Sequence, residues 1–366
     1  MSIKNVVRLN KVGDSLLFQY IILECLRKIK QERTTASVYH LLKGKRSSQT
    51  IQDAHVYRIG DYFGILKKLN RSTFENAIDD LIKNNYILMK NSNIAILTEK
   101  GIAHLNNNQE KYGTHYFNGM EYSNEVDIFY LRLQLAIQTY SNLANNCHQF
   151  VPLTDDRMIQ KFLKEHYKQY KSNVSIWLHD VYLELFDFLE AIPMTQAQLF
   201  VDRLSGFNKI GLSFNQLAVK NKLTVTDVSL NLTSILHRLY TDVNKDNNHT
   251  RQLKQFLYDQ PDTLLITQSA NKTLEWLVKG FSIEQIANIR KLKTSTIEDH
   301  IIEMAYADSA FDLARFIDAN TYHVIKTAFR QMQTTKLKEI REALNNQYNY
   351  FQIRLVLAYE SNQKRG

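Results

Sequence analysis

The side chains that could catalyse a reaction or hold a metal ion form no recognised pattern in this 366-residue sequence. Glu184, Asp187 and Glu190 recur every third residue along one predicted helix, but no histidine accompanies them at the i+3 spacing of a helical metal site. Cys25 and Cys147 stand alone, without CxxC or Cys/His spacing. Nucleophile, zinc and dinucleotide motifs and the GxxxxGK[ST] phosphate loop are also missing. We therefore expect no enzymatic activity, cofactor or metal site, and we interpret the three carboxylates as a solvated helix face.

Positive charge is the main chemical signal in the sequence. The net charge of +9 and the pI of about 9.2 favour a polyanionic partner. Residues 1–111 hold 18 Lys+Arg against 10 Asp+Glu, residues 112–270 hold 14 against 16, and residues 271–366 hold 14 against 11. Because the excess lies at the two ends, we expect phosphates to be contacted there and not in the middle.

The basic residues of the first third gather before and around one predicted helix and one predicted hairpin. The predicted phosphate contacts are Lys43, Lys45, Arg46, Lys67, Lys68, Arg71 and Lys90. Such a distribution suits sequence-independent contact to DNA phosphates better than base reading. The alternative is a solvated basic face without a ligand.

The elements that must position these residues follow the order of a winged helix. Helices are expected over residues 15–29 and 36–42, and after an apolar-periodic stretch Ser72 and Glu75 form an S-x-x-E capping box that opens another helix. Two short apolar runs then flank a turn at residues 90–93, which predicts a β-hairpin, and a last helix follows. The alternative is another small α+β domain with a helical hairpin and one β-ribbon.

Two later segments match each other without a gap, GLSFNQLA from Gly211 and GFSIEQIA from Gly280. In each copy the glycine is expected to end one helix, and Ser followed three residues later by Gln forms a capping box that opens the next. A small alanine then allows close crossing by a second helix, which is the order of a helix-turn-helix. The alternative is two unrelated helical hairpins with similar boundaries.

The second copy is expected to contact phosphates from its turn and not from its reading helix. The helix expected from residue 294 carries Glu298, Asp299 and Glu303, and carboxylates are unfavourable beside a polyanion. The predicted phosphate contacts are Arg290, Lys291, Lys293, Thr294 and Ser295. A protein-docking role for this module is the open alternative.

With only three prolines and eleven glycines, the chain has little material for long irregular loops or many β-turns. We therefore predict a mainly α fold in three domains. These are a basic, winged-helix-like domain with a small β-hairpin (1–111), a central helical array (112–270) and a C-terminal helix-turn-helix domain (271–366).

The C-terminal third also carries a family resemblance. TLEWLVKGFSIEQIANIRKLKTSTIEDHIIEMA, residues 273–305, resembles the helix-turn-helix domain appended to the C-termini of many bacterial RecQ-type helicases. KLKEIREALNNQYNYFQIRLVLAY, residues 336–359, resembles the tail that follows that domain. Together with LLKGKRSSQTIQDA, residues 41–54, the combination is similar to the YpbB-type proteins of low-GC Gram-positive bacteria, which are encoded beside a RecQ-family helicase. The resemblance implies a helicase-associated factor.

We therefore expect a non-enzymatic, DNA-associated accessory protein that partners a RecQ-type helicase in recombination or repair. A helix-turn-helix transcription regulator with a palindromic target, and a protein-docking adaptor without DNA affinity, are the alternatives. The first residues do not form a secretory signal, and no apolar stretch reaches the roughly 18 to 20 residues of a membrane span, so we expect a cytoplasmic protein without membrane contact.

Overall fold

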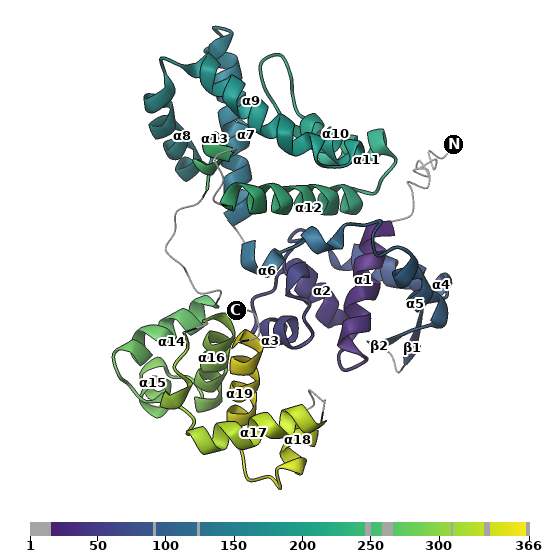
Figure 1. Cartoon of the computed structure of the whole chain (residues 1–366), viewed down its shortest axis with the longest axis vertical. Helices are drawn as coiled ribbons and strands as arrows, with labels where there is room; N and C mark the ends of the chain where they lie inside the picture. Colours follow the sequence, from purple (N-terminus) through teal and green to yellow (C-terminus); the bar gives the residue numbers. More distant parts are fainter. Residues whose placement is uncertain are drawn as a thin grey trace, which may run out of the picture. The chain divides into compact units, whose positions relative to one another are not determined.

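The computed structural model describes residues 16–90, 93–122, 125–245, 250–257, 266–308, 310–332 and 337–363. These residues are mainly helical, and their sheet is one antiparallel pair of strands (Figure 1). The predicted mainly α fold class is confirmed. No helix among them is both long enough and apolar enough to cross a membrane.

The chain forms two compact units. The N-terminal unit comprises Met1–Thr35 and Gly64–Asp259, and the C-terminal unit comprises Ala36–Phe63 and Gln260–Gly366. The helices of the N-terminal unit are α1 (Leu16–Ile29), α4 (Arg71–Lys83), α5 (Glu99–Asn107), α6 (Gly119–Tyr122), α7 (Glu125–Ala144), α8 (Arg157–Tyr170), α9 (Val174–Glu190), α10 (Met194–Arg203), α11 (Phe214–Asn221), α12 (Val225–Asn244) and α13 (Arg251–Lys254), and its strands are β1 (Ile87–Lys90) and β2 (Ile94–Leu97). The helices of the C-terminal unit are α2 (Thr35–Lys43), α3 (Ser48–Val56), α14 (Gln268–Val278), α15 (Ile283–Arg290), α16 (Thr294–Ala307), α17 (Ala319–Met332), α18 (Leu337–Ala343) and α19 (Tyr350–Gln363).

Helix α1 lies at the centre of the basic end of the N-terminal unit. It is apolar on nearly every side, as expected of a helix surrounded by other elements, and α4, α5, β2 and α12 all pack against it. In its first turn, Phe18 N donates a hydrogen bond to Asp227 Oδ1 of α12 at 3.0 Å. The winged-helix elements and the central array therefore pack as one unit, while the three-domain division stays a prediction.

The predicted β-hairpin is confirmed. Ile87 of β1 pairs with Leu97 of β2, and Lys90 pairs with Ile94. Residues 91–92 of the predicted turn lie outside the described residues. Helix α5 begins directly after β2, and a Cβ added at Gly101 would lie 2.2 Å from the backbone oxygen of Tyr86, so glycine is required for this close approach.

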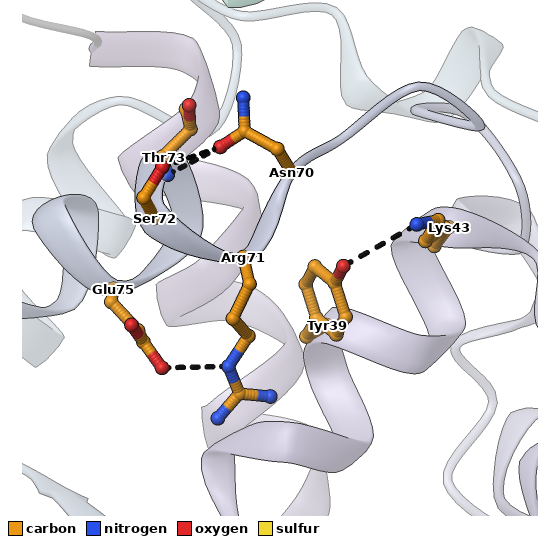
Figure 2. Close-up of polar contacts among 7 residues, drawn as sticks. All are labelled: Tyr39, Lys43, Asn70, Arg71, Ser72, Thr73 and Glu75. Atoms are coloured by element: carbon orange, nitrogen blue, oxygen red, sulfur yellow. Dashed lines mark hydrogen bonds and ion pairs between the residues drawn. The ribbon is translucent and has the colours of Figure 1, made fainter.

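The capping box predicted at Ser72 and Glu75 is wrong, because α4 begins two residues earlier than that pattern requires (Figure 2). Asn70 is the N-cap, and its Oδ1 accepts from Thr73 N at 2.7 Å. Asn is at least as good an N-cap as Ser, and the Ser72 hydroxyl instead donates to Asn70 Oδ1 at 2.9 Å. Glu75, now inside the helix, pairs with Arg71 one turn earlier.

The central array encloses a core rich in aromatic side chains. Its largest fully buried members are Trp177, Tyr140, Phe129, Phe200 and Phe256. Glu184 is half-buried at this core, where its two carboxylate oxygens accept from Gln252 N at 2.8 Å and Leu253 N at 2.9 Å. The solvated-face interpretation is therefore wrong for Glu184, which satisfies the first backbone N–H groups of α13, although Asp187 and Glu190 are exposed as expected.

Both copies of the repeat form a helix-turn-helix with the same local geometry. The capping boxes Ser213–Gln216 and Ser282–Gln285 are both present, which confirms this prediction. Helices α11 and α15 then end at Lys222 and Lys291, which adopt left-handed conformations with φ of 55° and 52°. The two turns are thus matched residue for residue.

The two glycines that open the copies differ in role. Gly280 follows α14 with φ of +87°, so it ends that helix as predicted. Helix α10 ends at Arg203, well before Gly211, so the prediction that Gly211 ends a helix is wrong. A Cβ at Gly211 would lie 2.2 Å from the Arg203 carbonyl oxygen, which explains the glycine by close backbone approach.

Helix α16 is the central element of the C-terminal unit. Helices α14, α15 and α19 pack around it, and so does α3, from a segment that the sequence analysis grouped with residues 1–111 (Figure 1). The ring of His55 on α3 stacks on Tyr306 of α16 at a centroid distance of 4.6 Å. Arg354 of α19 pairs with Asp299 at 2.6 Å and donates to Gln52 Oε1 of α3 at 3.2 Å. Helix α3 is therefore packed against the C-terminal core.

Candidate nucleic-acid interface

The predicted contacts of the N-terminal unit lie before α4, at its start and on the wing. The four side chains, those of Lys67, Lys68, Arg71 and Lys90, are all exposed. Two of them are already paired: Lys67 with Asp127 at 2.5 Å and Arg71 with Glu75 at 2.7 Å. Exposed pairs of this kind contribute little to stability, so a phosphate can replace the carboxylate at small cost. Lys68 and Lys90 have no side-chain partner among the described residues.

The exposed face of α4 is acidic overall and is poorly suited to lie along a phosphate backbone. Its solvent-facing carboxylates are Glu75, Asp79 and Asp80, against the cations Arg71 and Lys83. The Arg71 guanidinium is directed at Glu75, as Figure 2 shows, and Lys83 lies 3.8 Å from Asp80. The cations suited to phosphate contact in this unit are therefore Lys68 before the helix and Lys90 on the wing.

Lys43 is the last residue of α2, and Lys45 and Arg46 lie in the loop that leads to α3. The structure places all three in the C-terminal unit. Lys43 Nζ donates to the Tyr39 hydroxyl at 3.4 Å (Figure 2), whereas the exposed Lys45 side chain has no partner among the described residues. The charge of Arg46 acts on the buried Glu303 carboxyl of α16 and lowers its pKa, but burial has the larger effect, and the pKa of Glu303 is raised. The seven predicted N-terminal contacts are thus divided between two units.

Arg290 is held inside the C-terminal unit. One of its guanidinium nitrogens donates to the Ser269 carbonyl oxygen at 2.8 Å and also to the Thr273 hydroxyl, and the other donates to Ser269 Oγ at 3.1 Å. The first of these nitrogens, which donates to the Ser269 carbonyl oxygen, also lies 3.4 Å from His300 Nδ1. These contacts fix α15 against α14, so the predicted phosphate contact at Arg290 competes with an internal role.

The four remaining predicted residues of this module surround an open helix N-terminus. Lys293 is the N-cap of α16 and provides no side-chain cap, and Thr294 and Ser295 of the first turn are exposed. The side chains of Lys291 and Lys293 have no partner among the described residues. A helix N-terminus carries partial positive charge and N–H donors, so two adjacent lysines make it suitable for a phosphate group.

The first copy of the repeat lacks this opening. At the position that matches Lys293, Thr224 caps α12 by accepting from Asp227 N at 3.0 Å, and the Asp227 carboxylate in the first turn is buried. The helix start of the first copy is therefore closed by its own side chains. The sequence signal for this difference is the alignment of Thr224, a residue that can cap a helix, with Lys293, which cannot.

Beyond its first two residues, α16 presents no exposed side chain. The buried residues of α16 are Ile297, His300, Ile301, Ile302, Glu303, Met304, Ala305 and Tyr306. Two of its three carboxylates are used internally, because Asp299 pairs with Arg354 and Glu303 accepts from the backbone N and hydroxyl of Thr267. The partly exposed side chains near the start of α16 include Glu298 and Asp299, which are acidic, so its N-terminus is the part best suited to contact a phosphate.

His300 makes the stability of this module depend on pH. Burial, and then the nearby Arg290 cation, lower the pKa of His300 to about 4. An unfolded histidine has a pKa of about 6.5, so the unfolded state takes up a proton first as the pH falls. We expect the free energy of unfolding to decrease from about pH 6.5 to about pH 4 and then to lose this dependence.

Urea denaturation across this range tests the prediction, with His300→Gln expected to reduce the slope and His323→Gln, on the exposed side of α17, to leave it unchanged. Burial also lowers the pKa of His104, His166 and His237 in the N-terminal unit, so the single substitution removes one of four such contributions. An unchanged slope in His300→Gln would contradict the assignment.

Comparison with known proteins places this arrangement among related sequences. A family model described as RQC domain matches residues 20–114, and one described as helix-turn-helix domain matches residues 269–357. Both are domains found at the C-terminus of RecQ helicases, and together they suggest a RecQ-like, DNA-binding accessory role. The RQC match includes α2 and α3, which belong to the C-terminal unit.

One full-length relative also matches. Protein YpbB of Bacillus subtilis (strain 168) is 32% identical over 349 residues, which cover 94% of this chain and 98% of that protein. No solved structure matches the chain. The resemblance to the YpbB-type proteins is therefore confirmed, and it covers nearly the whole length of this chain.

Proposed function

This chain belongs to the YpbB family, and we propose that it is a non-enzymatic accessory protein that grips nucleic-acid phosphates, independently of sequence, beside a RecQ-type helicase. The observation that supports this most directly is the open N-terminus of α16, with Lys291 and Lys293 beside it and Thr294 exposed in its first turn. The N-terminal unit adds Lys68, before α4, and Lys90, on the wing.

The available cations share one property that favours phosphate contact over base reading. They lie on turns, loops and a strand end, and the available helix faces are acidic or buried. Of the predicted phosphate contacts, the lysines without a side-chain partner among the described residues are Lys45, Lys68, Lys90, Lys291 and Lys293. A transcription regulator would need base-reading side chains along a helix, and neither α4 nor α16 offers a basic set.

Binding of the purified chain to random-sequence duplex, single-stranded and forked DNA tests the proposal. We expect the logarithm of the binding constant to fall steeply with the logarithm of salt concentration, by about 0.9 for each duplex phosphate neutralised. Random competitor DNA should compete as well as any defined sequence. Absence of binding at low salt would overturn the proposal and favour the protein-docking adaptor, whereas a specificity ratio of roughly 10³ or more would favour the regulator.

The helicase partnership, with a place in recombination or repair in the cytoplasm, rests on the RQC and helix-turn-helix matches. A RecQ-type helicase from the same organism should bind the chain in analytical sedimentation, and the chain should increase unwinding of forked DNA at limiting helicase. A chain that neither binds that helicase nor changes its unwinding would contradict the partnership but leave the DNA-binding proposal standing.

A further inference from the structure

Helix α9 of the N-terminal unit is apolar on its outer face as well as on its core face. Trp177, Val181, Leu185 and Phe188 are buried in the central core. On the opposite side, the large exposed side chains are Ile176 (62% exposed), Tyr182 (58%), Leu183 (45%) and Phe186 (43%). A helix that is apolar all round is normally covered on all sides, and a contiguous exposed apolar surface marks an interaction site.

The exposed side chains form one stripe. Ile176, Leu183 and Phe186 are separated by seven and three residues, so they lie on the same helix face, with His179 between them. The Tyr182 ring lies beside that of Phe186 at a centroid distance of 5.8 Å. The stripe extends over most of a helix about 25 Å long.

The charges at the two ends of the stripe are opposite. Lys171 lies just before α9 and is exposed, while Asp187 and Glu190 are exposed in its last turn. None of these three side chains has a partner among the described residues. The acidic residues at the C-terminal end are also unfavourable for the helix dipole, so a positive partner is expected there.

The stripe is self-complementary when a second copy runs in the opposite direction. Ile176 and Phe186 lie five positions before and after residue 181, and His179 and Leu183 lie two positions before and after it. Lys171 and Glu190 lie ten before and nine after the same point. A two-fold axis at this level therefore places Ile176 against Phe186 of the second copy. It also brings the start of α9, with Lys171 in the turn just before it, to the end of the second copy's α9, where Glu190 lies.

We propose that this face of α9 binds a second copy of the chain as an antiparallel helix pair. Such an interface is isologous, since the same surface is used on both copies, and it also opposes the two helix dipoles. One helix face is smaller than the roughly 800 Å² that each partner contributes to a standard interface, so the dimer is weak and depends on concentration. The pair carries two copies of each phosphate-binding surface, which extends the proposed function without depending on it.

Sedimentation velocity of the full chain, over the micromolar range expected for a small interface, tests the proposal. The wild type should shift from monomer to dimer as its concentration rises. Phe186→Glu, which places a carboxylate against Ile176 of the second copy on each side of the pair, should remain monomeric, whereas Val219→Glu, at a 75%-exposed site on α11, should behave as wild type. A monomer at every concentration, or a dimer that Phe186→Glu does not affect, would overturn the proposal.

A charge exchange tests the direction of the pair. Lys171→Glu should raise the dissociation constant by roughly tenfold, because two cross-pairs become repulsive. Adding Glu190→Lys to the same chain should restore the wild-type value, because each pair is then opposite in charge again. Failure of the second change to restore dimerisation would rule out the antiparallel arrangement. Both sites are exposed, and an unchanged circular dichroism spectrum checks that each variant is folded.

Discussion

Replacing Lys291 and Lys293 together by glutamine is expected to weaken binding to random-sequence duplex DNA by roughly tenfold for each lysine at low salt. The slope of the logarithm of the binding constant against the logarithm of salt concentration should fall in magnitude by about 2, since each lysine neutralises one phosphate. The physical reason is the open N-terminus of α16, where no other cation lies within the first turn. Fluorescence anisotropy at several salt concentrations measures both quantities.

The first copy of the repeat provides a matched control. Lys222 occupies the position of Lys291 and has the same left-handed backbone conformation, with φ of 55° against 52°. Lys222→Gln therefore measures the effect of replacing a lysine in this backbone conformation when the helix that follows is already capped by Thr224. It should leave the DNA affinity almost unchanged. Equal losses in the two copies would show that the uncapped helix is not the reason for binding.

Tyr306→Ala is expected to destabilise the C-terminal unit by about 3–5 kcal/mol, because it removes a large, fully buried ring from the centre of its core. That ring also stacks on His55 of α3, so the substitution should release α3 from α16. A loss of stability together with release of α3 would show that α3 is part of the C-terminal core and does not merely touch α16. Thermal denaturation and hydrogen exchange of residues 36–63 measure the two effects.

Tyr306→Phe is the control that keeps the ring. The Tyr306 hydroxyl is buried and has no hydrogen-bond partner among the described residues. An unsatisfied buried polar group costs about 1–3 kcal/mol, so its removal should leave the protein equally stable or more stable. Marked destabilisation by Tyr306→Phe would mean that the hydroxyl has a partner, and a small effect of Tyr306→Ala would mean that this core is loosely packed.

The fold of the N-terminal unit shows why the sequence located the wing but not the start of α4. The hairpin follows from two apolar runs around a turn, which is a local signal that packing does not alter. The N-cap depends on which of two suitable side chains reaches the free N–H groups, and Asn70 takes this role before Ser72. Spacing alone could not choose between them.

The sequence by itself determined the mainly α class, the hairpin, both helix-turn-helix copies and the basic ends, because periodicity, capping residues and net charge act over a few neighbouring residues. Only the tertiary structure decided which of these residues remain available. Glu184, Arg290 and Glu303 find partners 68, 21 and 36 residues away in the chain. Helix α3 packs against α16, far along the sequence. Burial and hydrogen bonding between distant segments leave no periodic trace in the sequence, so the open N-terminus of α16 became visible only when its neighbours were in place.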